Sequence, residues 1–319
     1  MNHDGDDVPL SDVARLLKAE GFPPLSATVQ VEFGAHTRRG KSRPVNEDHY
    51  LVMRLGRHQE TLLSSMPASA AASRFEESGY ATFVADGISA GGDGEAAGRL
   101  AIVTLVYLVR QFGRWDLRID DTNARDLIHR AERFLRHVDG AMVQENETGA
   151  GPELQTTLTA TFGAGRELFF AHVGHSRAYL LRDSQLLRLT RDHTLSEMGT
   201  MHRRGRSRIP VAPLVDVSTA AVDLRHILTD AIGMTGTAGP QIDLERFELL
   251  DRDIVLVCSN GLTDVVDEDV IAGILSSGRS PDELSRTLVD LAMESGGDDD
   301  ATAVVAPYHL PEPERAPAT

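Results

Sequence analysis

The stretch Tyr80-Ala81-Thr82-Phe83-Val84-Ala85-Asp86-Gly87 leads an apolar strand directly onto an acidic residue. Residues 80–85 have the composition of a buried strand, which we expect to stop at Asp86, and a glycine-rich loop follows over residues 88–94. A carboxylate at the mouth of a core strand loses hydration, so it needs a cation or strong hydrogen-bond donors nearby. Gly87 lets the backbone turn tightly and bring its carbonyl toward the same point. Carboxylate and carbonyl oxygens together suit a hard metal ion.

The strands and helices expected around this stretch come in separate groups. Three short β-rich runs at residues 156–162, 167–173 and 176–182 are joined by Gly-Ala-Gly and Gly-His turns, which predict antiparallel hairpins. Further strands are expected at 253–258 and 301–307, and helices at 94–111, 122–144, 267–276 and 281–294. The last helix has Ser280 as its N-cap, Pro281 in its first turn and Glu283 to complete a capping box. This grouping predicts an α+β fold in which helices pack on antiparallel sheets.

The composition is that of an ordinary globular protein, and it narrows the function classes. The 319 residues are 41% hydrophobic, and 48 acidic against 32 basic residues give a formal net charge of −16. A general nucleic-acid binder would need a basic stripe, so we expect no nucleic-acid partner. Cys258 is the single cysteine, which excludes a disulfide framework and favours a reducing cytoplasm. No run approaches the roughly 18 apolar residues of a membrane helix, so we expect no membrane association.

One large domain accounts for most of the chain. Residues 1–28 are predicted to form an N-terminal appendage with a short helix over residues 12–20 that Ser11 can cap. The domain itself is expected over residues 29–307, followed by a proline-rich tail at 308–319. Residues 57–78 interrupt the pattern and are predicted to form an insertion loop.

Four places repeat the pattern of an acid at a strand end beside a turn. They are Glu47-Asp48, Asp86-Gly87, Asp264 and Asp298-Asp299-Asp300. Any one of them alone is more often a turn residue or a helix cap than a metal ligand. Four in one chain, each next to a predicted core strand, favour a shared site for cations.

In this order the segments resemble the metal-dependent serine/threonine protein phosphatases of the PPM, or type-2C, family, in its bacterial form. The resemblance covers roughly residues 31–306 and rests on five ordered motifs. They are RPVNED at 43–48, VADG at 84–87 with Glu95 behind it, AHVGHSRAYLLR at 171–182 with LTRDHT at 189–194, VLVCSNGLTD at 255–264, and DDAT at 299–302.

The resemblance implies a four-layer α-β-β-α architecture, in which a central β-sandwich of two antiparallel sheets is flanked by helices. It also implies two Mn²⁺ or Mg²⁺ ions in a cleft at one end of the sandwich, with the occupancy of a third site left open. Matching positions make Asp86 the ligand that bridges the two metals, with the Gly87 carbonyl on one ion and Asp299 on the other.

Three further acids and one arginine complete the implied site. Glu47 and Asp48 correspond to the shell that contacts the metals through water, and Asp264 belongs to the same metal site. Arg43 corresponds to the residue that holds the substrate phosphate. The implied activity is hydrolysis of phosphoserine and phosphothreonine monoesters on proteins by a metal-activated water. We expect the substrates to be products of a serine/threonine kinase, and we expect the protein to be a cytoplasmic monomer.

Four departures from the family pattern keep a second interpretation open. Asn260 stands where the family has a metal-ligating Asp, and its amide oxygen can bind a hard ion without contributing charge. His175 replaces an Asp tied to the third metal, which favours Mn, Fe or Zn over Mg or abolishes that site. Arg38 replaces an Asp near the start, and Ser89-Ala90 replace a glycine pair. The alternative is therefore a pseudophosphatase that binds phosphoproteins without turnover.

The acidic run near the C-terminus leaves its register to be chosen. Taking Asp299 as the metal ligand puts Thr302 where the family motif requires it and Asp300 in the position of an Asn. Cys258 is expected to be a packed thiol, and His193 is expected to serve a turn rather than catalysis. The basic stretch 201–208 falls where the family carries a variable flap.

Overall fold

The computed structural model describes residues 29–66, 74–88, 93–113, 117, 119–149, 151–203, 223–236 and 238–310. The predicted appendage at 1–28, Ser89-Ala90 and most of the basic stretch 201–208 lie outside the described residues. In this part of the chain, no helix has the length and apolar character needed to cross a membrane.

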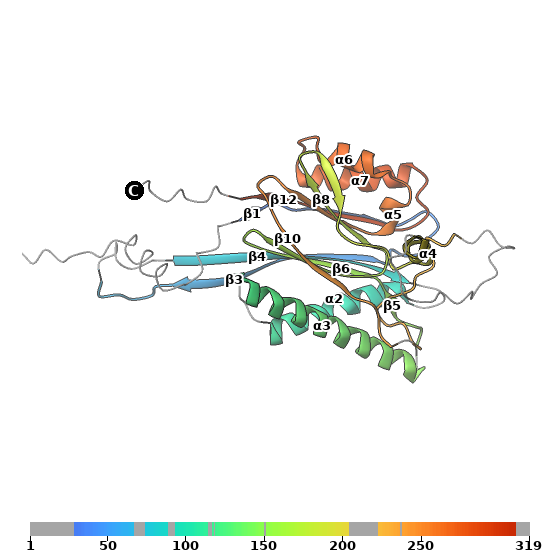
Figure 1. Cartoon of the computed structure of the whole chain (residues 1–319), viewed down its shortest axis with the longest axis horizontal. Helices are drawn as coiled ribbons and strands as arrows, with labels where there is room; N and C mark the ends of the chain where they lie inside the picture. Colours follow the sequence, from blue (N-terminus) through green and yellow to red (C-terminus); the bar gives the residue numbers. More distant parts are fainter. Residues whose placement is uncertain are drawn as a thin grey trace, which may run out of the picture.

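Two antiparallel sheets form the centre of the domain (Figure 1). The first sheet has the order β1-β12-β11-β8-β9, and β2 also pairs with β12. Its strands are β1 (Gln30–Val31), β2 (Gly34–Arg38), β8 (Arg177–Arg182), β9 (Gln185–Arg188), β11 (Ile254–Cys258) and β12 (Ala301–His309). The second sheet has the order β10-β7-β6-β4-β3, and β5 pairs with the end of β4. Its strands are β3 (Asp48–Glu60), β4 (Arg74–Ile88), β5 (Gln155–Thr156), β6 (Leu158–Ala164), β7 (Glu167–Val173) and β10 (Asp243–Glu248).

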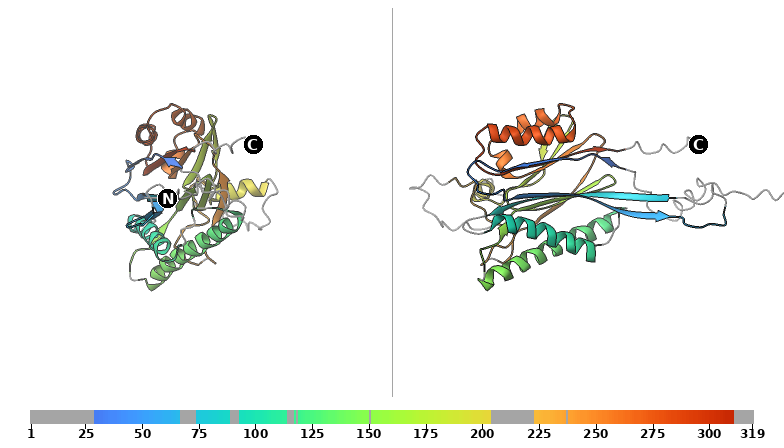
Figure 2. Two further views of the ribbon diagram at one scale, coloured as in Figure 1. Left: turned by 90° about the vertical axis from the view of Figure 1, so that its left-hand side faces the viewer. Right: turned by 180° about the vertical axis from the view of Figure 1, so that it is seen from behind.

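Helices cover the outer face of each sheet, which gives the expected α-β-β-α layers (Figures 1 and 2). Helices α2 (Gly94–Phe112) and α3 (Asp121–Thr148) lie on the second sheet. Helices α5 (Asn260–Thr263), α6 (Glu268–Leu275) and α7 (Pro281–Glu294) lie on the first sheet. Helix α4 (Leu195–Arg203) follows the β8–β9 hairpin in the chain.

Strand β11 shows why the sequence reads as continuous apolar runs. Val255 and Val257 point between the two sheets, whereas Leu256 and Cys258 point toward α6 and α7. Because both faces of the strand are covered, every position is apolar and period-two alternation disappears. Each sheet thus contributes to two of the three cores, and the two sheets are held together by the middle one.

Several sequence-based expectations are confirmed. The Ser280 side chain accepts a hydrogen bond from the Glu283 amide at the start of α7, and the Glu283 carboxylate accepts one from the Ser280 amide, so the capping box is present. The long helices agree with the predictions within a few residues at each end. By contrast, strand β12 extends beyond the expected end at residue 307 to His309, so two residues assigned to the tail pair with β1.

Three expectations are wrong. Strand β4 does not stop at Asp86 but continues to Ile88, because β5 supplies hydrogen-bond partners beyond the acid. Strands β7 and β8 are not a hairpin: they lie in different sheets, and the turn at Gly174, with φ of 107°, carries the chain across the sandwich. The predicted loop 57–78 is shorter, because β3 and β4 pair as far as Glu60 and Arg74. Polar residues on a two-stranded ribbon gave no apolar signal there, although their backbones are paired.

Candidate metal and phosphate site

A cleft lies where the ends of both sheets meet. Its volume is about 220 Å³. Its lining residues come from six separate segments of the chain: Arg43, Asp86, Gly87, Ile88, His175, His226, Leu228, Asn260 and Asp299. Arg43, Asp86, Gly87, His175, Asn260 and Asp299 were all proposed as site residues from the sequence, and the fold brings them to one place.

Two buried carboxylates face each other at the base of this region. Asp86 on β4 is the direct cross-strand partner of Asp48 on β3, and both are at most 6% exposed. Like charges in that position repel. Burial, followed by the neighbouring acids Asp48 and Asp299, raises the pKa of Asp86 well above its usual value, and burial raises the pKa of Asp48 to about 8. The pair therefore requires a positive charge if both carboxylates are to ionise at neutral pH.

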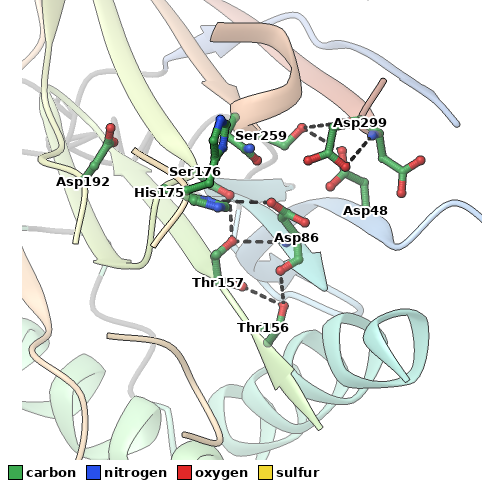
Figure 3. A network of polar contacts seen from close by, with 12 residues as sticks. Asp48, Asp86, Thr156, Thr157, His175, Ser176, Asp192, Ser259 and Asp299 are labelled. Atoms are coloured by element: carbon green, nitrogen blue, oxygen red, sulfur yellow. Dashed lines mark hydrogen bonds and ion pairs between the residues drawn. The ribbon is translucent and has the colours of Figure 1, made fainter. Parts of the chain in front are cut away.

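Hydroxyl groups fix the backbone around Asp86 (Figure 3). The Asp86 amide donates to Thr157 Oγ1 at 3.2 Å, and its carbonyl accepts from Thr156 Oγ1 at 2.9 Å. Thr157 Oγ1 in turn shares a 2.7 Å hydrogen bond with Ser176 Oγ, just before β8. These contacts leave the Asp86 carboxylate free to face the cleft, where Oδ2 lies 3.7 Å from His175 Nδ1.

Gly87 is required by a close backbone approach. A Cβ atom at this position would lie 2.0 Å from the carbonyl oxygen of Gly94, at the start of α2. The Gly87 amide donates to the carbonyl of Glu47 at 3.2 Å. The strand end, the helix start and the acidic segment before β3 are thus locked together.

Arg43 supplies positive charge among these acids. Its Nε donates to Asp299 Oδ1 at 2.8 Å, and its Nη1 donates to Glu47 Oε2 at 3.0 Å. Glu47 is nearly buried, whereas the Asp299 side chain is about one-third exposed toward the cleft. Arg43 therefore lies at the mouth of the acidic cluster, with one carboxylate on each side.

Asp299 and Asp300 have different surroundings. Asp300 is buried and accepts from the Gly40 amide and the Glu47 amide, each at 2.8 Å, one with each carboxylate oxygen. It fixes the loop that carries Arg43. Asp299 instead lines the cleft.

The segment after β11 places an amide at the cleft. Asn260 Nδ2 donates to Asp264 Oδ2 at 3.1 Å, which fixes the orientation of the amide. Its Oδ1 is buried and has no hydrogen-bond partner among the described residues. The same holds for Asp48 Oδ1 and His175 Nδ1. Asp48 Oδ2 accepts from Ser259 Oγ at 2.6 Å. A buried acceptor without a partner lowers the stability of the fold, so these three atoms point to a bound cation that is not part of the polypeptide.

Burial lowers the pKa of His175, which keeps its imidazole neutral and able to donate a lone pair. Within the described ranges no three His, Cys, Asp or Glu side chains form a metal site by themselves. The donor set here mixes two carboxylates, an amide, an imidazole and the Gly87 backbone.

Sequence reasoning missed His226 and Leu228, which line the cleft from the loop before Ile232. His226 Nδ1 lies 3.6 Å from Asp264 Oδ2. No motif surrounds these residues, so only the fold reveals them. Arg38, one of the departures, contacts Asp290 on α7 instead of the cleft.

Other residues singled out in the sequence have structural surroundings. Cys258 is buried, and burial raises the pKa of its thiol to about 12. His193 packs its ring against His172 and lies 3.4 Å from Asp243, away from the cleft lining. Asp192 of the same segment accepts two hydrogen bonds from Arg177, at 3.0 and 2.7 Å.

Curated bacterial phosphatases are similar to this chain in sequence. The chain is 31% identical over 229 residues to the serine/threonine protein phosphatase PstP of Mycobacterium tuberculosis, a match that covers 70% of this chain and 39% of PstP. It is 31% identical over 155 residues to the serine/threonine phosphatase stp of Listeria welshimeri, covering 49% of this chain and 57% of that protein. The chain thus spans less than two-thirds of the length of these relatives. No protein-family model matches the sequence.

Solved structures share the fold as well. The crystal structure of Mycobacterium tuberculosis PstP/Ppp superposes with a TM-score of 0.60 at 27% identity, covering 87% of this chain and 98% of that one. The PstP catalytic domain in complex with two manganese ions superposes with a TM-score of 0.59 at 26% identity, covering 88% and 100%. In sequence and in fold the chain is thus similar to bacterial serine/threonine phosphatases, in line with its resemblance to the PPM, or type-2C, family.

This similarity agrees with the resemblance found in the sequence, and it makes the two departures from the family pattern in the cleft informative. Asn260 and His175 occupy positions where the family pattern has Asp. Both side chains line the cleft, and each keeps one unpartnered buried atom there. The substitutions therefore change the chemistry of the donors while leaving them in place.

Proposed function

We propose that this protein is a metal-dependent phosphatase that hydrolyses phosphoserine and phosphothreonine monoesters on proteins. The observation that carries the proposal is the pair of buried, directly opposed carboxylates Asp48 and Asp86 beside unpartnered buried acceptors. Such an arrangement is unfavourable unless cations occupy the cleft. The relative PstP, whose catalytic domain was solved with two manganese ions, supports the same reading.

The residues present fit two Mn²⁺ or Mg²⁺ ions. Asp86, the Gly87 carbonyl and Asp299 would hold them directly, and Asn260 would add an uncharged amide oxygen. Glu47, Asp48 and Asp264 would act around them, through water or through hydrogen bonds to the direct ligands. When bound, the ions supply Lewis-acid charge and acidify the attacking water. His175 would favour Mn, Fe or Zn over Mg at a third position.

Arg43 is proposed to hold the substrate phosphate. Its Nε and Nη2 both contact Asp299 Oδ1, at 2.8 and 2.7 Å, so the edge suited to two-point phosphate binding faces the cleft. A phosphomonoester dianion is a stronger acceptor than the single Asp299 oxygen and can take over this edge. The Nη1 contact with Glu47 then keeps the guanidinium oriented.

The alternative, a pseudophosphatase that binds phosphoproteins without turnover, has less support. Asp86, Asp299 and Arg43 are all present and all line the cleft. Within the cleft lining, the departures from the family pattern remove negative charge at Asn260 and His175 only. Weaker metal binding is the expected consequence, rather than loss of the reaction.

The test is hydrolysis of p-nitrophenyl phosphate and of a phosphothreonine peptide, with Mn²⁺ or Mg²⁺, by the wild type and by Asp86→Ala. We expect metal-dependent turnover by the wild type and a loss of at least 100-fold in the variant. The matched control is Asp120→Ala, which removes a helix cap at the exposed start of α3 and not a cleft residue. If the wild type is no faster than Asp86→Ala with either metal, the enzyme proposal fails.

We propose that the substrates are phosphoproteins made by a serine/threonine kinase, because the relatives are named serine/threonine phosphatases. We also propose a monomer in a reducing cytoplasm, where the single buried thiol of Cys258 would stay reduced. Analytical ultracentrifugation and cell fractionation test these two points.

A further inference from the structure

An apolar cavity lies far from the cleft, between the second sheet and helices α2 and α3. Its volume is about 150 Å³, and it is partly open to solvent. Val106 and Val109 line it from α2, Leu127 and Ala131 from α3, and Ala160 and Phe162 from β6. Figure 1 shows both helices crossing beneath this sheet.

The packing around the cavity is incomplete for a domain core. Strand β6 lies in the middle of the sheet, yet Ala160 and Phe162 are only half-buried on the face that the helices cover. The first half of α3 is also loosely packed, because Leu127 and Ala131 are half-buried, whereas Leu135 and Val138 in the second half are fully buried. Protein interiors rarely leave apolar space of this size unfilled.

Among the described residues, Arg130 is the charged side chain that lines this mostly apolar space. Arg130 on α3 is half-buried beside Leu127 and Ala131, and it makes no hydrogen bond or ion pair with any described residue. By contrast, Arg136 on the same helix pairs with Glu132 at 2.8 Å. An unpaired guanidinium beside apolar walls is complementary to a ligand with an apolar body and an anionic head.

We propose that this cavity binds an aliphatic carboxylate, with the chain between α2, α3 and β6 and the carboxylate on Arg130. A dry cavity of about 150 Å³ accommodates a group the size of benzene, which corresponds to a chain of about six to eight carbons that reaches the rim. Each buried methylene should raise affinity about fourfold. The two-point geometry of the guanidinium selects a carboxylate over an alcohol of the same length.

The cavity and the cleft are separate binding places on the same helix. Val106 and Val109 belong to the C-terminal half of α2, whereas Gly94 at its first residue packs against Gly87 in the cleft. Acetate has the same head group as the proposed ligand but no chain, so it reports binding at the cleft cations or at Arg43 without filling the cavity.

The test is isothermal titration of the full chain with octanoate, hexanoate, 1-octanol and acetate. We expect saturable one-to-one binding of octanoate, binding of hexanoate that is about 16-fold weaker for two fewer methylenes, and no comparable heat from acetate. Arg130→Gln should weaken octanoate binding about tenfold and leave 1-octanol unchanged. The matched control is Arg133→Gln, an exposed arginine on the same helix outside the cavity, which should behave as the wild type.

A second variant tests the apolar half of the site. Ala131→Leu fills the space with a strong helix former and should reduce octanoate binding at least tenfold. Circular dichroism checks that the variant is folded, and if it is not, the comparison of Arg130→Gln with Arg133→Gln decides. Absence of saturable octanoate binding, or equal binding by folded Ala131→Leu, overturns the proposal. Equal affinity for octanoate and 1-octanol in the wild type overturns the assignment of the carboxylate to Arg130.

Discussion

Replacing Asn260 with Asp restores the charge that the PPM pattern has at this position, and its effect can be worked out from the cleft. A unit charge about 4 Å from a divalent ion contributes about 8 kcal/mol at an effective dielectric constant of 20. The new carboxylate would also face Asp264, because the hydrogen bond from Asn260 to Asp264 spans 3.1 Å. Two carboxylates at that separation repel by about 5 kcal/mol under the same assumption.

At neutral pH this repulsion is relieved by a proton shared between the two acids, and a metal ion must displace that proton. The difference between the attraction to the ion and the repulsion between the carboxylates is a gain of about 3 kcal/mol in metal-binding free energy before desolvation. We therefore expect Asn260→Asp to bind Mn²⁺ about 10- to 100-fold more tightly. The metal-free variant should be less stable than the wild type at neutral pH, because holding a proton on a carboxyl whose ordinary pKa is about 4 costs free energy that the Asn260 amide does not. The rise in Mn²⁺ affinity and the fall in the stability of the metal-free protein are measured separately.

The assay is titration calorimetry with Mn²⁺, together with urea unfolding in the presence of EDTA. Gln111→Glu, at the exposed end of α2, adds the same charge far from the cleft and should change neither quantity appreciably. Unchanged Mn²⁺ affinity in Asn260→Asp would refute the reasoning, because it would mean that the Asn260 oxygen does not face the metal.

Three further predictions concern the acidic run at residues 299–300, His175 in the cleft, and Asp192 beside β8. Asp299→Ala should abolish turnover and should unfold as the wild type does. Asp300→Ala should lower the free energy of unfolding by about 3 to 6 kcal/mol, because two buried amides lose a charged acceptor. Asp300→Asn keeps one acceptor, so it should lose about half as much stability and stay active. His175→Asp should raise turnover with Mg²⁺ relative to Mn²⁺, measured as the ratio of the two rates, and an unchanged ratio would separate His175 from the metals. Burial acts to raise the pKa of Asp192, but the hydrogen bonds from Arg177 outweigh burial and lower this pKa. The stability that results is present above about pH 4 and is lost as the pH falls through the lowered pKa. Asp192→Asn should therefore flatten the acid limb of a plot of unfolding free energy against pH.

The sequence predicted the layers of the fold better than the path of the chain. Strands such as β11 and helices such as α7 carry their signals locally, in apolar runs and in a capping box. The crossing from β7 to β8 does not, since a glycine turn at residue 174 looks the same whether it closes a hairpin or changes sheets. Only the pairing of β8 with β11 distinguishes the two, and that contact spans more than 70 residues.

In the candidate site, too, some residues carry a local signal in the sequence and others are revealed only by the fold. Acids in motifs were identifiable because each stands at a strand end, where a charge is unexpected. His226 was not, because an isolated histidine in a loop has no pattern until the fold brings it to Asp264. The distinct surroundings of Asp299 and Asp300 were likewise invisible, as neighbours in one acidic run differ only in which backbone amides they meet.

The position of Asp86 explains why the cleft depends on the whole sandwich. Its backbone is held by Thr156 at the end of β5 and by Thr157 between β5 and β6 of the second sheet. The groups facing it, Asn260 and Asp299, follow β11 and precede β12 in the first sheet. No local segment contains both halves of the donor set, so their separation is fixed by the apolar side chains packed between the sheets. A core substitution there that lets the sheets shift should therefore weaken metal binding before it unfolds the protein, because the buried carboxylates tolerate only a narrow range of cation positions.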